Sequence, residues 1–213
     1  MARDAGRQAA GVGHLGGRIA GKRRARARVS FATAAAHAAA PRGGVAGAGV
    51  VGWLVVRVLF TRLSDRTHRF EVTRGDGSSE NAVLETRSYL VHDLTHYAVE
   101  AEVPIEDGFY GLLDRGTPLE RLNDRTQIEP LSPGLAVAES LVGPMQSLFG
   151  GRLDPALFRE QCEQRFPGLV AMGFVERAVA RLRRLAGHWA ATPFHGAMEL
   201  EWPAVPVGGR AHA

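Results

Sequence analysis

The spacing of apolar residues changes once along this chain, near residue 87, and this change restricts the folds open to it. Before it, three short stretches rich in β-branched and aromatic residues are separated by turn-forming residues: 54–61, 68–73 and 82–86. After it, apolar residues recur at helical spacing, most regularly over 173–191. Strands followed by helices predict an α+β protein, with a small antiparallel β-meander followed by a cluster of packed helices.

Prolines mark the starts of several predicted helices. Thr117-Pro118, Ser132-Pro133 and Asp154-Pro155 each place a capping residue before a proline at the first helical position. We expect three helices, the second kinked or broken at Gly143-Pro144. The alternating stretch 197–202 predicts a strand that returns to the sheet.

The first fifty residues differ from the rest in charge. They contain nine Arg and Lys residues and one acid, Asp4, so their net charge is +8 and that of the remaining chain is −4. This Arg/Ala/Gly-rich composition predicts a disordered tail over 1–52, which we interpret as upstream sequence translated from an early start codon or as a targeting segment. A single α+β domain is expected over 53–205, and a disordered C-terminus over 206–213.

Other features exclude several classes of protein. Cys162 is the only cysteine, so no intrachain disulfide can form, and a reducing cytoplasm is the expected location. No apolar run reaches the ~18 to 20 residues of a membrane span. The G-x-G-x-x-G matches at 11–16 and 47–52 lack the strand before and the helix after that a dinucleotide site needs. The chain has no G-x-S-x-G elbow, P-loop or Cys-x-x-Cys pair.

The densest group of reactive side chains lies in a predicted helix over 88–102, with Ser88 as its N-cap. At 100° per residue, His92, His96 and Glu100 project from one side of this helix, and its apolar residues project from the other. Two histidines at i and i+4 can bind one metal ion such as zinc. Glu100 could be a further ligand or could hold His96 in place, and Asp93 could act as a general base or orient a ligand.

Other ligands and a purely structural role stay open for this helix. His68, His188 and His195 are further candidates for the third ligand. In the structural interpretation, Glu100 and His96 form an i, i+4 pair and His92 faces solvent. The sequence therefore predicts a possible divalent metal site, and it identifies neither a reaction nor a substrate.

Two resemblances involve the same helix. His92-Asp93-x-x-His96 resembles the H-E-x-x-H motif of metallopeptidases, with Asp93 in place of the glutamate that acts on metal-bound water. The stretch 90–116 resembles small uncharacterised bacterial proteins that share an LxHDLxHY-like helix and a Gly-aromatic-Gly loop, a resemblance that implies no established activity. In that loop, Phe109 and Tyr110 are either a lid over a site or aromatic anchors in the core.

An alternative function comes from the last predicted helix. Arg177, Arg181 and Arg184, followed by His188, lie opposite its apolar face, and such a stripe could bind an acidic partner or nucleic acid. The acidic balance of the domain argues against nucleic acid, and a solvated helix face is the simpler interpretation. We expect no nucleic-acid binding, and the oligomeric state is left open.

Overall fold

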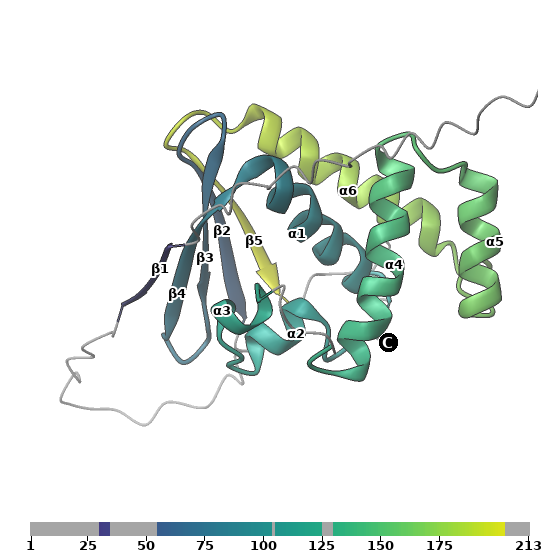
Figure 1. The fold of residues 1–213 in the computed structure, drawn as a ribbon, viewed down its shortest axis with the longest axis horizontal. Coiled ribbons are helices and arrows are strands. Elements are labelled where there is room, and N and C mark those ends of the chain that lie inside the picture. The colour runs from purple at the N-terminus through teal and green to yellow at the C-terminus, as the bar shows by residue number, and fades with distance from the viewer. Residues whose placement is uncertain (1–29, 35–54, 104, 125–129, 203–213) are drawn as a thin grey trace, which may run out of the picture.

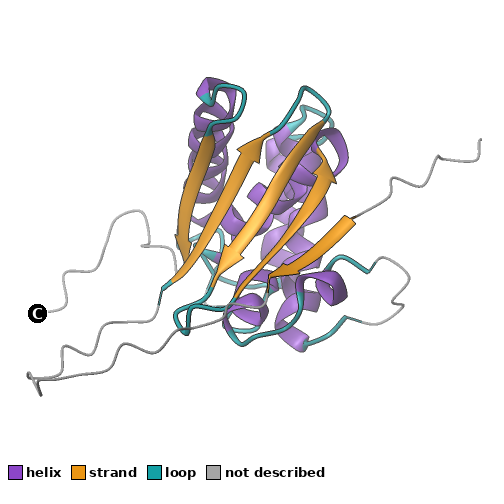
Figure 2. Ribbon diagram, turned by 90° about the vertical axis from the view of Figure 1, so that its left-hand side faces the viewer, coloured by secondary structure: helices purple, strands orange, loops and turns teal. Residues whose placement is uncertain are grey.

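The computed structural model describes residues 30–34, 55–103, 105–124 and 130–202. Their five strands form one sheet, in which all neighbouring strands are antiparallel and the order is β1-β4-β3-β2-β5. The strands are β1 (Ser30–Ala34), β2 (Val56–Arg62), β3 (Thr67–Thr73), β4 (Ser79–Glu85) and β5 (Ala197–Trp202). Figure 2 shows the helices gathered behind one face of this sheet, which confirms the α+β class.

The meander follows from alternation along each strand. Val56, Val58 and Phe60 of β2 are buried, and the residues between them are more exposed. A tight turn joins β3 to β4, where the positive φ of 83° at Gly77 suits a residue without a side chain. The returning strand β5 pairs with β2, as the sequence predicts.

Six helices in the described part of the chain complete the fold. Figure 1 shows α1 beside the sheet, α4 beyond α1, and α5 farthest from the sheet. The bounds are α1 (Thr86–Glu100), α2 (Phe109–Asp114), α3 (Leu119–Leu122), α4 (Pro133–Phe149), α5 (Pro155–Arg165) and α6 (Phe174–Ala191). Because α4 and α6 both contact α1, the helix at the centre of the sequence is also central in space.

The helix starts agree only partly with the sequence predictions. The Ser132 hydroxyl caps α4 and the Asp154 carboxylate caps α5, as expected. In contrast, α1 begins at Thr86 after Glu85, and the Ser88 hydroxyl donates a hydrogen bond to the Glu85 side chain in place of capping the helix. No break occurs at Pro144, because α4 is one helix from Pro133 to Phe149.

Part of the predicted tail joins the sheet. Ser30–Ala34 pairs with β4 from Ser79 to Val83 and forms one edge of the sheet. The remainder of 1–52, both G-x-G-x-x-G matches and the predicted C-terminal tail 206–213 lie outside the described residues.

Cys162 is buried in α5, and burial raises the pKa of its thiol to about 11. With this raised pKa the reactive thiolate is scarce near neutral pH, so Cys162 is a small core residue. Among the described residues, no helix has the length and apolar character required to cross a membrane.

Candidate metal centre

The polar side of α1 is covered, which the sequence alone did not indicate. Asp93, His96 and Glu100 are only 2%, 0% and 3% exposed, because α4 packs over this side of the helix. His92 lies nearer the edge, with 29% of its side chain exposed. Buried polar groups of this kind need partners, and each of the four has at least one.

Each histidine has a carboxylate from its own helix at Nδ1. His96 Nδ1 lies 2.9 Å from Glu100 Oε1, and His92 Nδ1 lies 3.3 Å from Asp93 Oδ1. A carboxylate can only accept, so Nδ1 of each ring is the donor. This arrangement leaves the Nε2 atoms of both rings directed away from these carboxylates.

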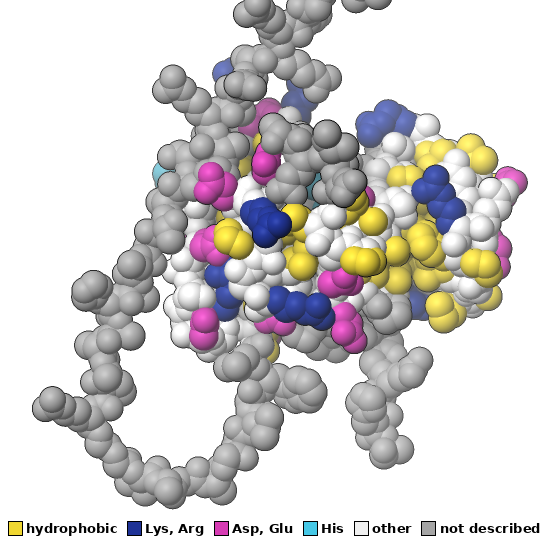
Figure 3. Space-filling view, turned by 60° about the horizontal axis from the view of Figure 1, so that its bottom comes forward, with side chains coloured by type: hydrophobic (Ala, Val, Ile, Leu, Met, Phe, Trp, Pro, Cys, Tyr) yellow, Lys and Arg dark blue, Asp and Glu magenta, His cyan; other side chains and the backbone are white. Residues whose placement is uncertain are grey.

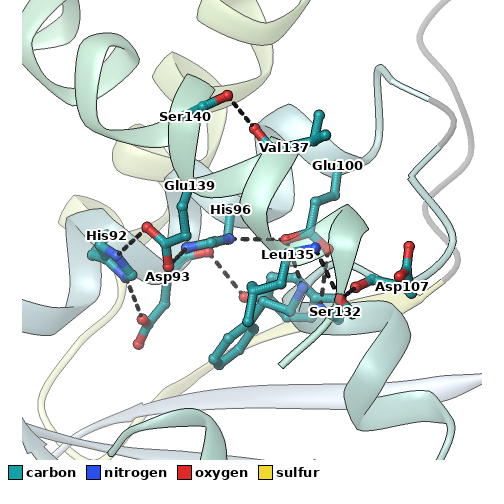
Figure 4. A network of polar contacts seen from close by, with 12 residues as sticks. His92, Asp93, His96, Glu100, Asp107, Ser132, Leu135, Val137, Glu139 and Ser140 are labelled. Atoms are coloured by element: carbon teal, nitrogen blue, oxygen red, sulfur yellow. Dashed lines mark hydrogen bonds and ion pairs between the residues drawn. The ribbon is translucent and has the colours of Figure 1, made fainter. Parts of the chain in front are cut away.

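A third carboxylate, from another helix, faces both Nε2 atoms. Glu139 on α4 places Oε1 3.2 Å from His96 Nε2 and Oε2 3.8 Å from His92 Nε2, as Figure 4 shows. One ligand atom from each of the three residues can be chosen so that all lie within 4.8 Å of one another. Among the described residues, no other group of three such side chains converges in this way.

Glu139 is the residue that the sequence analysis missed. A signal for it exists, since Glu139 is the only charged side chain in the seventeen residues of α4. A lone carboxylate in a helix of otherwise uncharged, mainly apolar residues favours a specific partner. The identity of that partner depends on the packing of α4 against α1, which no local pattern specifies.

Glu100 has a different role from the ligand role considered above. Its carboxylate accepts hydrogen bonds from His96 and from the backbone N–H groups of Phe109 and Tyr110, at 2.9, 2.9 and 3.0 Å. Both oxygens are therefore engaged on the side of His96 that faces away from Glu139. Glu100 holds His96 in place and does not belong to the converging group.

Asp93 is likewise placed to orient a histidine. Its side chain is 2% exposed and lies against His92 Nδ1, and it does not line the pocket in front of the histidines. A base acting on water in that pocket would need to reach it. The geometry therefore favours the second role considered for Asp93, that of orienting His92.

The charges of the group are strongly coupled. Burial disfavours a charged imidazole, but the nearby Glu100 and Glu139 carboxylates outweigh it and raise the pKa of His96 to about 9. Burial is similarly outweighed at His92, whose pKa is raised by Asp93 and Glu139. The two histidines in turn lower the pKa of Glu139.

The Nε2 atom of His96 has no hydrogen-bond partner of good geometry, although it is fully buried and close to Glu139. A buried nitrogen without a hydrogen bond is unfavourable unless another group engages it. This buried nitrogen is therefore available to a cation held between His96 and Glu139.

A pocket of about 520 Å³ gives access to this group. Its walls include His92, Glu139 and Phe109, and the rest are mainly residues of α3, α4 and the segments next to them. Figure 3 brings the bottom of the molecule in Figure 1 forward, and among the described residues visible there basic and acidic side chains are intermixed and form no continuous patch of one sign.

The remaining histidine candidates lie elsewhere. His68 is buried on β3 between Phe60 and Trp189, with both ring centroids 5.9 Å away. His188 and His195 are exposed, on α6 and in the loop before β5. None of the three joins the group formed by His92, His96 and Glu139.

Phe109 and Tyr110 are anchors in the core. They begin α2 and are 4% and 0% exposed, so both side chains are packed inside the protein. The Tyr110 hydroxyl donates to the main-chain oxygen of Asp93 at 3.0 Å. Phe109 stacks obliquely on His96 with ring centroids 5.4 Å apart, so this residue also shapes the wall of the site.

The arginine stripe on α6 is largely engaged within the molecule. Arg177 and Arg181 both pair with Glu102, at 2.7 and 2.8 Å, and the Glu102 side chain is 1% exposed. Arg181 itself is buried, which contradicts a solvated helix face, while Arg184 is exposed. Two of the three guanidinium groups therefore neutralise a buried carboxylate.

Comparison with known proteins adds no relative: no protein-family model, curated protein or solved structure matches this chain.

Proposed function

We propose that this protein binds a divalent metal ion through His92, His96 and Glu139 and uses it to activate water for hydrolysis. The observation that carries the proposal is the convergence of two imidazole Nε2 atoms on one carboxylate, each imidazole being held at Nδ1 by a second carboxylate. Carboxylates that orient ligating histidines in this way are a regular feature of metal sites.

Zinc is the ion that suits these donors best. It accepts imidazole nitrogen and carboxylate oxygen, and three protein ligands leave one position for water in a catalytic site. That position would face the pocket lined by His92, Glu139 and Phe109. A zinc-bound water has its pKa lowered toward ~7, so hydroxide becomes available near neutral pH.

The main competing interpretation is an internal ion-pair cluster. In the absence of metal, a protonated His96 between Glu100 and Glu139 is a stable arrangement, in line with its raised pKa. Two observations favour the metal: His96 Nε2 has no well-aligned hydrogen bond, and the cluster borders a pocket. An ion pair with a purely structural role requires neither a nitrogen without a hydrogen bond nor an adjoining pocket.

The deciding experiment is a measurement of metal content and affinity. Protein purified without an affinity tag should contain about one equivalent of metal or bind one equivalent of Zn²⁺ in a titration. His96→Ala and Glu139→Ala should reduce binding to background, because each removes a ligand. His188→Ala is the matched control, since it removes an exposed histidine outside the cluster and should bind as the wild type does.

The hydrolytic part has its own test. Metal-loaded wild type should hydrolyse an activated ester, and chelation should abolish this activity until metal is restored. Less than one equivalent of metal in the wild type even after Zn²⁺ titration, or equal metal in His96→Ala and wild type, would eliminate the metal site. Full metal binding without chelator-sensitive hydrolysis would support a metal-binding protein and would rule out the proposed hydrolytic activity.

A further inference from the structure

The hydrogen bonds of Glu100 suggest how His96 is oriented for metal binding. This inference rests on the function proposed above. Three donors converge on this carboxylate: His96 Nδ1 and the backbone N–H of Phe109 at Oε1, and the backbone N–H of Tyr110 at Oε2. We propose that Glu100 is a positioning residue that fixes the proton of His96 on Nδ1 and so directs the lone pair of Nε2 toward the metal.

The argument rests on what a carboxylate can do here and an amide cannot. Both oxygens of Glu100 accept hydrogen bonds, which matches three donors and no acceptor. A glutamine at position 100 would have only one oxygen. If the glutamine NH₂ faced Tyr110, it would meet the backbone N–H of Tyr110, which is also a donor. If the NH₂ faced His96, Nδ1 of His96 would have to accept a hydrogen bond, and the imidazole proton would move to Nε2.

The neighbouring glycine makes this contact possible. A Cβ atom added to Gly108 would lie 2.5 Å from both Cδ and Oε2 of Glu100, closer than carbon atoms pack. The backbone of Gly108 has φ −73° and ψ −168°, which any residue can adopt. The glycine is therefore required by the approach of Glu100 and not by an unusual backbone conformation.

The same contacts link the metal site to the pocket. Glu100 joins His96 on α1 to the first residues of α2, where Phe109 forms part of the pocket wall and packs on the His96 ring. Displacing the carboxylate should thus change the orientation of a ligand, and it should do so without removing any ligand.

The test compares two variants that disturb the same contact in different ways. Glu100→Gln removes the charge and one acceptor, and Gly108→Ala keeps the charge but pushes the carboxylate away. Both should weaken Zn²⁺ binding by about 10- to 100-fold, the effect usual for loss of a partner that orients a ligand. Both should also alter the visible absorption spectrum of the Co²⁺-substituted protein, which reports on the geometry around the metal.

The control is Gly143→Ala, a glycine-to-alanine change on α4, the helix of Glu139, where a Cβ meets no atom within 4 Å. It should leave the Zn²⁺ affinity and the Co²⁺ spectrum unchanged. If Glu100→Gln does not fold, Gly108→Ala decides alone. Wild-type affinity and spectrum in the folded variants would overturn the positioning role and leave the metal site standing, whereas a wild type that binds no metal would overturn both.

Discussion

His68 shows how one buried side chain can make stability depend on pH. It is fully buried on β3, its Nδ1 lies 3.3 Å from the Thr86 hydroxyl, and its Nε2 has no hydrogen-bond partner. Burial lowers the pKa of this histidine below 6.5, and the charge of Asp93 opposes the change only partly. The imidazole is therefore neutral in the folded protein over a wider pH range than in the unfolded chain.

The sign of the pH effect follows from this difference. Below pH 6.5 the unfolded chain takes up a proton at His68 that the folded protein does not. The free energy of unfolding should thus fall as pH decreases from 6.5, and His68 should contribute no pH dependence well above 6.5. In His68→Phe, which keeps an aromatic ring beside Phe60 and Trp189, this part of the dependence should disappear.

Urea denaturation of the wild type and His68→Phe between pH 8 and pH 5 measures how the free energy of unfolding of each protein depends on pH. The other titrating groups, including His92 and His96, are common to both, so the difference between the two curves isolates His68. Parallel curves over the whole range would contradict the prediction.

At the scale of the element, one buried carboxylate links the end of α1 to α6. Glu102, just after α1, pairs with Arg177 and Arg181 of α6 while its own side chain is 1% exposed. Replacing Glu102 by glutamine would remove the negative charge that pairs with the buried Arg181. We expect Glu102→Gln to lower the free energy of unfolding by about 3 kcal/mol, the lower end of the range for breaking a buried pair.

The same helix contains a matched control. Glu176 pairs with Arg159 at 2.6 Å, but both side chains are exposed. Surface pairs contribute little, so Glu176→Gln should change stability by less than about 1 kcal/mol. Thermal or denaturant unfolding of both variants decides the matter, and equal effects would show that burial of Glu102 has no energetic role.

At the scale of the whole molecule, four of the five strands and the candidate metal centre lie within residues 56–202. The buried core identified in the structure runs from Val56 to Trp202. The segment before it contributes β1, whose pairing covers the outer edge of β4. An uncovered strand edge offers unpaired N–H and C=O groups to another molecule.

Deletion of residues 1–54 should therefore separate two properties. Cooperative unfolding and Zn²⁺ affinity should remain, because the core and the three proposed ligands are retained. The truncated protein should self-associate more than the full chain at the same concentration, because deletion of β1 leaves the edge of β4 unpaired. Light scattering coupled to gel filtration measures the association, and loss of cooperative unfolding would show that the first 54 residues belong to the folding unit.

Local features of the sequence determined much of this protein. Stretches rich in β-branched and aromatic residues placed β2 and β3, and alternation placed β5. Helical spacing placed α1 and α6, and the Ser132 and Asp154 caps placed α4 and α5. These features depend on neighbours in the chain, which the sequence displays directly. The two histidines and their spacing were also evident from the sequence.

Only the tertiary structure decided which side chains meet. Glu139 reaches His92 and His96 because α4 packs on α1, and Glu100 turns toward α2 because Gly108 leaves room for it. For the same reason Arg181 is buried against Glu102, although its helical position suggested an exposed stripe. Contacts between helices depend on how whole faces fit together, and the periodicity of a single helix does not contain that information.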